Sequence, residues 1–264
     1  MMRIKRSFLR LLPVWMTAII LLAGNCYAQE DAQPASEEAA AAPVKTEKVH
    51  SFYYKAKLKR TVKVEGGKIK AGKTVTVTGK KGKKSKIIYR KKKYTVASSA
   101  LRLVDFVTRG SKPYSVASAE AFVNQRGYRS KTSYLIWVSC YTQHVYVLRG
   151  RARHWKVAKH FKCATGIFDS PTPRTVSTVT YKRPWSWSHK PSGRGVYYGV
   201  RIKGGLIHSW IYNIRWAQSH GGKKRRCGRE RYGKPASHGC VRVRLDNAKW
   251  LYKHIPLKTT TVVY

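Results

Sequence analysis

A cysteine near the C-terminus stands in a sequence context that favours reactivity over packing. Cys240 directly follows Ser237, His238 and Gly239, in a turn rich in Pro, Gly and Ser. A cysteine nucleophile needs a base for its proton and backbone N–H donors for the oxyanion of the intermediate. Gly239 allows a tight turn in which successive N–H groups converge beside the sulfur. His208, at the end of an apolar β-type run, is the candidate base, so these residues together predict acyl transfer through a thioester.

These residues belong to a longer pattern. Ile207-His208-Ser209, followed by Ser237-His238-Gly239-Cys240-Val241-Arg242, resembles the signature of the L,D-transpeptidases with a YkuD-type catalytic domain. The stretches 164–166 and 170–173 are similar to the Ser-Thr-Gly and Pro-Thr-Pro segments of that family, and 246–252 is similar to the helix after its cysteine. The resemblance covers residues 131–264 and implies a catalytic domain built as a β-sandwich.

The resemblance also implies a reaction. Cys240 attacks the carbonyl of the third stem residue of a peptidoglycan tetrapeptide, the terminal D-alanine leaves, and the amine of a neighbouring stem takes the acyl group. His208 acts as base and acid, with Ser209 or a backbone carbonyl near it orienting the imidazole. His238 and Gly239 shape the oxyanion turn through their main chain. The candidate substrate contacts are Arg242, Ser237 and Trp210. No cofactor and no metal is implied. An unperturbed imidazole base predicts a rate change at about pH 6 to 7.

The sequence departs from the family pattern in three places. Residues 209–236 separate His208 from the cysteine turn, a longer interval than in many members. The basic, Gly-rich insert 211–235 is either a lid over the cleft or a solvated loop. Arg242 stands where some relatives have Asn, and Arg174 stands where Gly commonly follows Pro-Thr-Pro.

Other interpretations of the same residues remain open. Water in place of the acceptor amine makes the protein an L,D-carboxypeptidase. An inert catalytic-like domain makes it a non-catalytic cell-wall-binding protein, with His208 an ordinary strand histidine and Cys240 a buried thiol. A zinc site is a further option, although the spacing of its candidate ligands matches no common arrangement. Those candidate ligands are His208, His220, Cys227, His238 and Cys240.

The N-terminus resembles an export signal. Residues 1–28 combine four basic residues, the apolar stretch 11–23 and a Cys26-Tyr27-Ala28 cleavage pattern, as a secretory signal peptide does. A lipidated Cys26 and an uncleaved anchor are the alternatives. We therefore expect a secreted protein at the cell wall or extracytoplasmic face, which meets the membrane only transiently through its signal segment. Residues 29–48, rich in Ala, Glu and Pro, are a predicted flexible linker.

The charge of the chain limits its partners. Lys and Arg number 55 against 11 Asp and Glu, with 42% hydrophobic residues. Such a surplus usually indicates nucleic acid, but export places the protein away from it, so we expect no nucleic-acid partner. The predicted partners are peptidoglycan stem peptides and anionic cell-wall polymers.

The spacing of apolar residues predicts a mainly β fold. Residues 49–105 alternate over short runs punctuated by glycines, which predicts a small β-barrel and resembles bacterial SH3-like wall modules; a basic β-domain of unknown role is the alternative. A helix is expected over 115–127, capped by Ser115 or Ser118. A second helix is expected to begin at an Asp246 cap and to end at Pro256.

Three cysteines besides Cys240 follow the predicted signal. Cys140 and Cys163 fall on neighbouring predicted strands, where either a disulfide or two buried thiols fit the pattern. The sequence does not decide between these states, and it leaves the state of Cys227 equally open.

Overall fold

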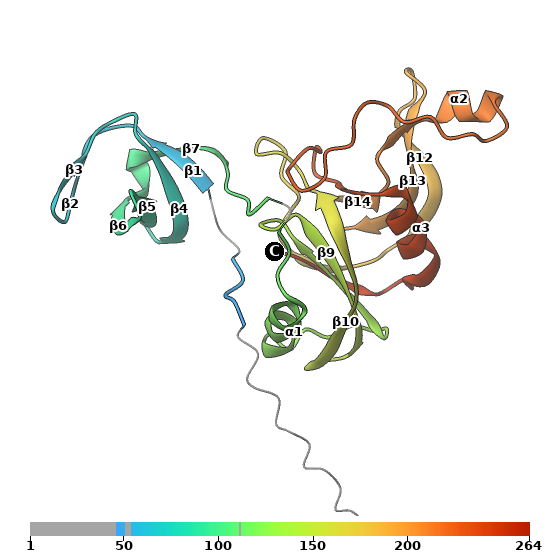
Figure 1. Cartoon of the computed structure of the whole chain (residues 1–264), viewed down its shortest axis with the longest axis horizontal. Helices are drawn as coiled ribbons and strands as arrows, with labels where there is room; N and C mark the ends of the chain where they lie inside the picture. Colours follow the sequence, from blue (N-terminus) through green and yellow to red (C-terminus); the bar gives the residue numbers. More distant parts are fainter. Residues whose placement is uncertain (1–45, 51–53, 111) are drawn as a thin grey trace, which may run out of the picture. The chain divides into compact units, whose positions relative to one another are not determined.

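The computed structural model describes residues 46–50, 54–110 and 112–264. The predicted signal peptide at 1–28 and most of the predicted linker at 29–48 lie outside the described residues. The described chain is mainly β, as the sequence predicts (Figure 1). None of its described helices is long and apolar enough to cross a membrane.

Residues 54–106 form a small domain, called here the β-domain. Its elements are β1 (Tyr54–Leu58), β2 (Val62–Val64), β3 (Gly67–Ile69), β4 (Thr74–Lys81), β5 (Lys84–Tyr89), β6 (Lys92–Ala97), a 3-10 turn (Ser98–Ala100) and β7 (Leu101–Phe106). Five strands form an antiparallel sheet in the order β6-β5-β4-β1-β7, and β2 and β3 form a separate hairpin.

The alternation in the sequence explains how the β-domain packs. In β4 the threonines face outward while Val75 and Val77 point inward and are buried. They meet Ile87 and Val96 from the next two strands in one apolar cluster. Side chains of a strand alternate between its two faces, so this pattern buries one face of the sheet and leaves the other to the lysines. The likeness to SH3-like modules stays a prediction.

The C-terminal part of the chain carries the remaining elements. They are α1 (Val116–Gln125), β8 (Tyr134–Ser139), β9 (His144–Arg151), β10 (His154–Ala164), β11 (Val176–Thr178), β12 (Lys182–His189), β13 (Arg194–Ile202), β14 (Gly205–His208), β15 (Ile211–Asn213), α2 (Ile214–Ser219), β16 (Val241–Val243), α3 (Leu245–His254) and β17 (Thr260–Val263). The strands pair in the order β11-β17-β8-β9-β10-β16-β14-β13-β12, with β15 beside β13.

The long strand β10 connects two halves of this sheet. Its residues 154–162 pair with β9, whereas Cys163 and Ala164 pair with β16. Side chains from both halves share one core with the inner face of α3, and the predicted β-sandwich stays a prediction. That core includes Val138 and Val147 from one half, Ile207 and Val241 from the other, and Leu251 from the helix. β14 and β16 therefore lie in the interior of the strand order, between β10 and β13.

The two long helices test the sequence-based caps. The hydroxyl of Ser115 accepts a hydrogen bond from the amide of Ser118, which confirms Ser115 as the cap of α1. The predicted Asp246 cap is wrong, because α3 begins at Leu245 and its cap position is Arg244. Asp246 lies in the first turn, where its negative charge still favours the N-terminal end of the helix dipole.

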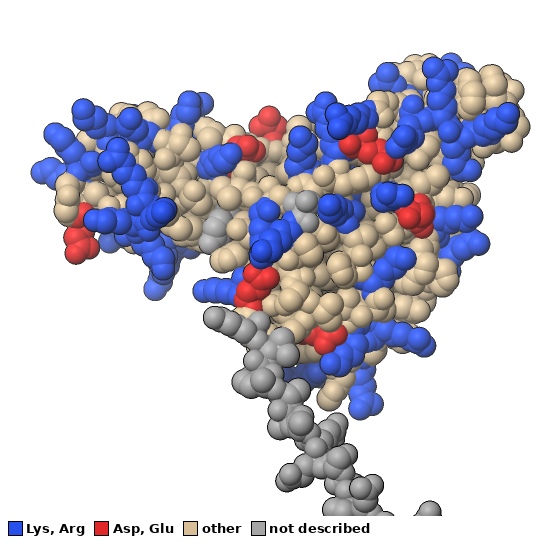
Figure 2. Space-filling view, viewed as in Figure 1, with Lys and Arg blue, Asp and Glu red and all other residues tan. Residues whose placement is uncertain are grey.

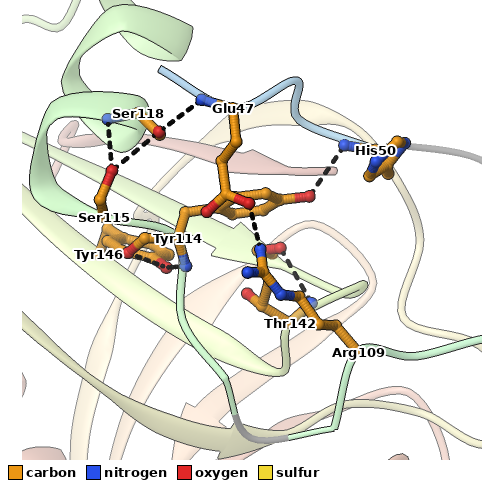
Figure 3. A network of polar contacts seen from close by, with 9 residues as sticks. Glu47, His50, Arg109, Tyr114, Ser115, Ser118, Thr142 and Tyr146 are labelled. Atoms are coloured by element: carbon orange, nitrogen blue, oxygen red, sulfur yellow. Dashed lines mark hydrogen bonds and ion pairs between the residues drawn. The ribbon is translucent and has the colours of Figure 1, made fainter. Parts of the chain in front are cut away.

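Residues 46–50 form a short strap on the C-terminal domain (Figure 3). The Glu47 amide donates to the Ser118 hydroxyl over 2.9 Å, and its carboxylate pairs with Arg109 over 2.5 Å. The His50 amide donates to the Tyr114 hydroxyl over 2.9 Å. These contacts bind the segment before the β-domain to helix α1 and to the loop between the β-domain and α1.

The four cysteines of the described residues, Cys140, Cys163, Cys227 and Cys240, are all free. The disulfide considered between Cys140 and Cys163 is therefore absent. Cys163 lies in the apolar core between the two halves of the sheet, where burial raises its pKa well above the ordinary thiol value. Burial also raises the pKa of Cys140. Cys163 packs as a small apolar group, whereas the Cys140 thiol also interacts with the side chains of Arg174 and Thr165.

Candidate active site

Cys240 ends the predicted turn and directly precedes β16. Gly239 has φ +107°, in the left-handed region that favours glycine, as expected for a turn at this point. The buried hydroxyl of Ser237 donates to the carbonyl oxygen of Cys240 and closes the turn. A Cβ added at Gly205 would lie 3.3 Å from the Cα of Cys240, so β14 approaches the cysteine backbone closely.

His208 ends β14 and is buried, with 4% of its surface exposed. β14 and β16 run parallel, and the register places Ile207 beside Val241 and His208 beside Arg242. Adjacent strands lie about 4.8 Å apart. His208 therefore stands opposite a residue only two positions after Cys240. The strand pairing places His208 beside the strand that follows Cys240, a residue 32 positions further along the chain.

The imidazole of His208 is held in one tautomer. Its Nδ1 lies 2.5 Å from the carbonyl oxygen of Ser209. A carbonyl only accepts, so Nδ1 carries the proton and Nε2 of the neutral ring keeps its lone pair. The hydroxyl of Ser209 is used elsewhere, since it donates to the Trp210 carbonyl and accepts from the amide of Tyr197. Ser209 thus orients His208 through its main chain, one of the two possibilities that the sequence left open.

Burial lowers the pKa of His208 from 6.5 to about 4. The hydrogen bond to Ser209 opposes this shift, and the positive charge of Arg242 adds to it. The ring is therefore neutral and able to accept a proton at any pH well above 4. The rate change at about pH 6 to 7 that an unperturbed imidazole base predicts is therefore expected near pH 4 instead.

The turn also provides candidate oxyanion donors. The amides of Ala236 and Ser237 are taken, because both donate to the carbonyl of Thr165, at 2.9 and 3.1 Å. The described part of the chain offers no acceptor to the next three amides, those of His238, Gly239 and Cys240. The side chain of His238 is exposed. This arrangement fits the prediction that His238 and Gly239 act through their backbone.

Arg242 is held by two protein contacts, and its buried Nε has no hydrogen-bond partner among the described residues. One terminal nitrogen donates to the carbonyl of Ala236 over 2.8 Å, and the guanidinium lies 4.8 Å from the ring centre of Trp210. Trp210 itself is buried, and its Nε1 donates to the carbonyl of Cys227. Arg242, Trp210 and Ser237 thus hold the insert and the turn in place, and their contact with substrate stays a prediction.

The predicted Thr-Gly and Pro-Thr-Pro segments support the cysteine turn. The amide of Ile167 donates to the carbonyl of Ser237 over 2.8 Å. The hydroxyl of Thr172 accepts from the amide of Gly166 over 2.9 Å, which fastens the two segments to each other. A Cβ at Gly166 would collide with the backbone of Ser170 and Thr172, so only glycine fits there.

Sequence reasoning missed Gln143. Its fully buried amide donates to the hydroxyl of Thr165 and the carbonyl of Cys140, both over 2.7 Å, and its oxygen accepts from the amide of Thr165 over 2.9 Å. Thr165 in turn accepts from the cysteine turn. A polar residue in a hairpin gives no signal of such a position in the sequence.

The insert 211–235 begins as ordered structure that includes β15 and α2. Hydrogen bonds fasten its later part to the domain: among them, the amide of Cys227 donates to the carbonyl of Ile211, that of Gly233 to the carbonyl of Cys163, and the hydroxyl of Tyr232 to the carbonyl of Val243. Tyr212, Ile214 and Trp210 form its apolar base. Among the described residues no group of three or more His, Cys, Asp or Glu is placed to hold a metal ion, so the zinc option gains no support.

Comparisons with known proteins bear on this domain. Residues 133–263 match the family model of the YkuD L,D-transpeptidase catalytic domain. One similar solved structure is a fused Zn-dependent amidase/peptidase/peptidoglycan-binding domain-containing protein from Clostridium acetobutylicum ATCC 824, with 27% identity over 56% of this chain and 59% of that chain and a TM-score of 0.44. Another is an L,D-transpeptidase from Stackebrandtia nassauensis, with 18% identity over 53% and 59% and a TM-score of 0.39.

A third similar structure is an L,D-transpeptidase from Mycobacterium smegmatis, with 14% identity over 78% of this chain and 76% of that chain and a TM-score of 0.38. The chain spans 59% of the length of each of the first two. No match is found among curated proteins. The match to the family model and the mainly β fold lead to one conclusion: residues 133–263 of this chain form a YkuD-type L,D-transpeptidase catalytic domain.

Proposed function

We propose that this protein transfers acyl groups between peptidoglycan stem peptides, with Cys240 as the nucleophile. The observation that carries the proposal is the pairing of β14 with β16, which sets His208 beside the strand that follows Cys240. The hydrogen bond from His208 to the Ser209 carbonyl supports it, because it leaves Nε2 as the free base.

The proposed reaction has two steps. The Cys240 sulfur forms a bond to the carbonyl carbon of the third stem residue while its proton passes to His208 Nε2. The bond to the terminal D-alanine breaks, and the imidazolium returns the proton to the leaving amine. The amine of a neighbouring stem then attacks the thioester, gives up its proton to His208 and releases the thiol, which yields a link between two third residues.

Two parts of the site assist this reaction in the proposal. The amides of His238, Gly239 and Cys240 stabilise the oxyanion, since they are the donors of the turn that the protein leaves free. Arg242 faces the acyl donor with the edge that is not committed to Ala236. Its positive charge then attracts a carboxylate of the stem peptide.

The setting of the reaction is also part of the proposal. We place the protein at the extracytoplasmic face of the cell, brought there by the predicted signal at 1–28. We further propose that the β-domain is an SH3-like wall module. Its five-stranded antiparallel sheet and exposed lysines support a role in holding the enzyme near anionic wall material.

The intact mass of the protein after exposure to a carbapenem tests the nucleophile, because a thiol of this family is acylated by that class. We expect one adduct, located on Cys240 by peptide mapping and absent from Cys240→Ala. Cys227→Ser is the matched control, since Cys227 is another half-buried thiol of the same region, and it should keep the adduct. An adduct on any other cysteine would refute the assignment.

Purified muropeptides test the reaction itself. A cross-linked dimer, detected by mass, is the expected product. Release of D-alanine without a dimer would instead establish the carboxypeptidase. Wall material retained by Cys240→Ala, together with no turnover by the unaltered protein, would establish the non-catalytic binding protein.

A further inference from the structure

A groove of about 500 Å³ lies within the β-domain, apart from the cysteine turn. Its lining includes Lys86 from β5, Lys93 and Thr95 from β6, Thr78 from β4 and Val64 from the β2–β3 hairpin. The carboxylate of Glu65 also lines it, at the tip of that hairpin. The proposed reaction uses none of these residues.

The register of the sheet brings the two lysines together. Lys86 stands opposite Thr95, and Lys93 stands opposite Ile88, two residues further along β5. Lys86 and Lys93 are therefore diagonal neighbours on one face, with Cα atoms about 7 to 8 Å apart. Both are exposed, and neither forms an ion pair within the described residues. Two lysines without an ion-pair partner thus line the groove together with Thr78 and Thr95.

The rest of the β-domain strengthens the positive potential of this groove. Residues 54–106 contain 15 lysines and 3 arginines, against Glu65 and Asp105 as the only acids. Figure 2 shows lysine and arginine side chains spread over this part of the molecule. Like charges repel, so this density destabilises the domain unless an anion neutralises it. Because a bound polyanion would relieve this repulsion, the charge density indicates a polyanionic ligand.

The choice of residues narrows the chemistry of that ligand. Lysine is a flexible point charge that binds phosphate in many orientations, whereas the planar fork of arginine fixes the orientation of the carboxylate or phosphate that it holds. Single-stranded nucleic acids need exposed aromatic rings on which bases stack. The aromatic residues of the β-domain, Tyr54, Tyr89, Tyr94 and Phe106, are all partly buried. Lysine charge without stacking platforms favours a phosphodiester polymer without bases.

We propose that the groove between β4, β5, β6 and the β2–β3 hairpin binds a flexible polymer of repeating phosphodiesters, held by Lys86 and Lys93 and by the hydroxyl of Thr95. The identity of this polymer as one of the cell envelope rests on the proposed function. The binding itself does not, since no residue of the cysteine turn takes part.

Binding of the full chain to poly(glycerol phosphate) of defined length, measured across a salt series, tests this proposal. Lys86→Gln/Lys93→Gln is the test variant. Lys57→Gln/Lys70→Gln is the matched control, because it removes the same charge from exposed positions of the same domain outside the groove. Thermal unfolding confirms that both variants fold.

We expect the groove variant to bind about tenfold more weakly, and the control less than threefold. The slope of log K against log salt should fall by about 1.4 in the groove variant, at ~0.7 per lost contact. Equal weakening by the two variants, or none by the groove variant, would refute a defined site. Polyglutamate or single-stranded DNA of equal charge binding as tightly as the phosphodiester polymer would refute the assignment of the ligand.

Muropeptide turnover, measured on the same preparations, separates this proposal from the proposed function. The groove variant should process soluble muropeptides at the rate of the unaltered protein. Polymer binding without any turnover would overturn only the transpeptidase. Turnover without polymer binding would overturn only the groove.

Discussion

The pH dependence of turnover provides a sharp test of His208 as the base. Its pKa is lowered from 6.5 to about 4, chiefly by burial and also by the charge of Arg242. A base must be unprotonated to act, so lowering the pH removes activity only as the pH approaches 4. An exposed imidazole would lose activity as the pH falls below 6.5.

The size of the difference follows from the two pKa values. At pH 5 a base with a pKa of about 4 is about 90% unprotonated, whereas one with a pKa of 6.5 is about 3% unprotonated. The two cases therefore differ by about thirtyfold in kcat/KM at this pH, relative to the neutral plateau.

The assay measures kcat/KM for muropeptide turnover from pH 4 to 8 at constant ionic strength. We expect a flat profile from pH 8 to about pH 5, then a tenfold loss per pH unit below about 4. An acid limb centred between pH 6 and 7 would refute the buried, neutral base.

Unfolding must be monitored in parallel. The unfolded chain protonates His208 near pH 6.5 while the folded chain does so near 4, so each pH unit in this window removes about 1.4 kcal/mol from the free energy of unfolding, about 3 kcal/mol in total. Tryptophan fluorescence at each pH separates this loss of fold from the loss of the base.

Three substitutions test how the site and the domain are held. Gly166→Ala should lower the free energy of unfolding by about 1 to 3 kcal/mol, because the alanine Cβ would lie against the Ser170 carbonyl and 2.6 Å from the Thr172 nitrogen. Chemical denaturation measures this free energy. Lys182→Met should cost about 1 kcal/mol by the same measurement, since its ammonium donates to the carbonyls of Tyr252 in α3 and of Ile255 at the cap of that helix, at 2.7 and 2.9 Å. Lys156→Met, at an exposed position, should cost less. Arg242→Lys keeps the charge but loses the planar contact with Trp210 and the hydrogen bond to Ala236. Hydrogen exchange of the backbone amides over 227–236 should therefore accelerate, while the acid limb of turnover stays near pH 4. Unchanged exchange would contradict the role given to Arg242.

The sequence predicts those parts of the site that local chemistry determines. Cys240 and Gly239 are recognisable because a reactive thiol and a tight turn need these residue types at adjacent positions. The cap at Ser115 is readable for the same reason, since a helix start satisfies its own amides from nearby side chains. The Asp246 cap fails by two positions because β16 runs directly into α3 and leaves no separate cap turn.

Other parts depend on contacts between distant segments. Local residue patterns do not predict that β14 and β16 pair across the insert, that Gln143 binds Thr165, or that Arg242 packs on Trp210. The pKa of His208 belongs to the same class, because it results from burial by the assembled sheet. Each of these properties exists only once the two halves of the domain have packed.

The burial of His208 serves both halves of the proposed reaction. Above pH 4 the ring is neutral, with Nδ1 bound to the Ser209 carbonyl, so Nε2 is ready to take the thiol proton during attack. The imidazolium formed in that step is a strong acid, because the same desolvation that lowers its pKa makes it give up the proton readily. It therefore delivers that proton to the departing amine, which is a poor leaving group without it. A more exposed histidine would keep the proton longer at neutral pH, so we expect the buried position at the end of β14 to favour release of the D-alanine rather than reversal of the attack.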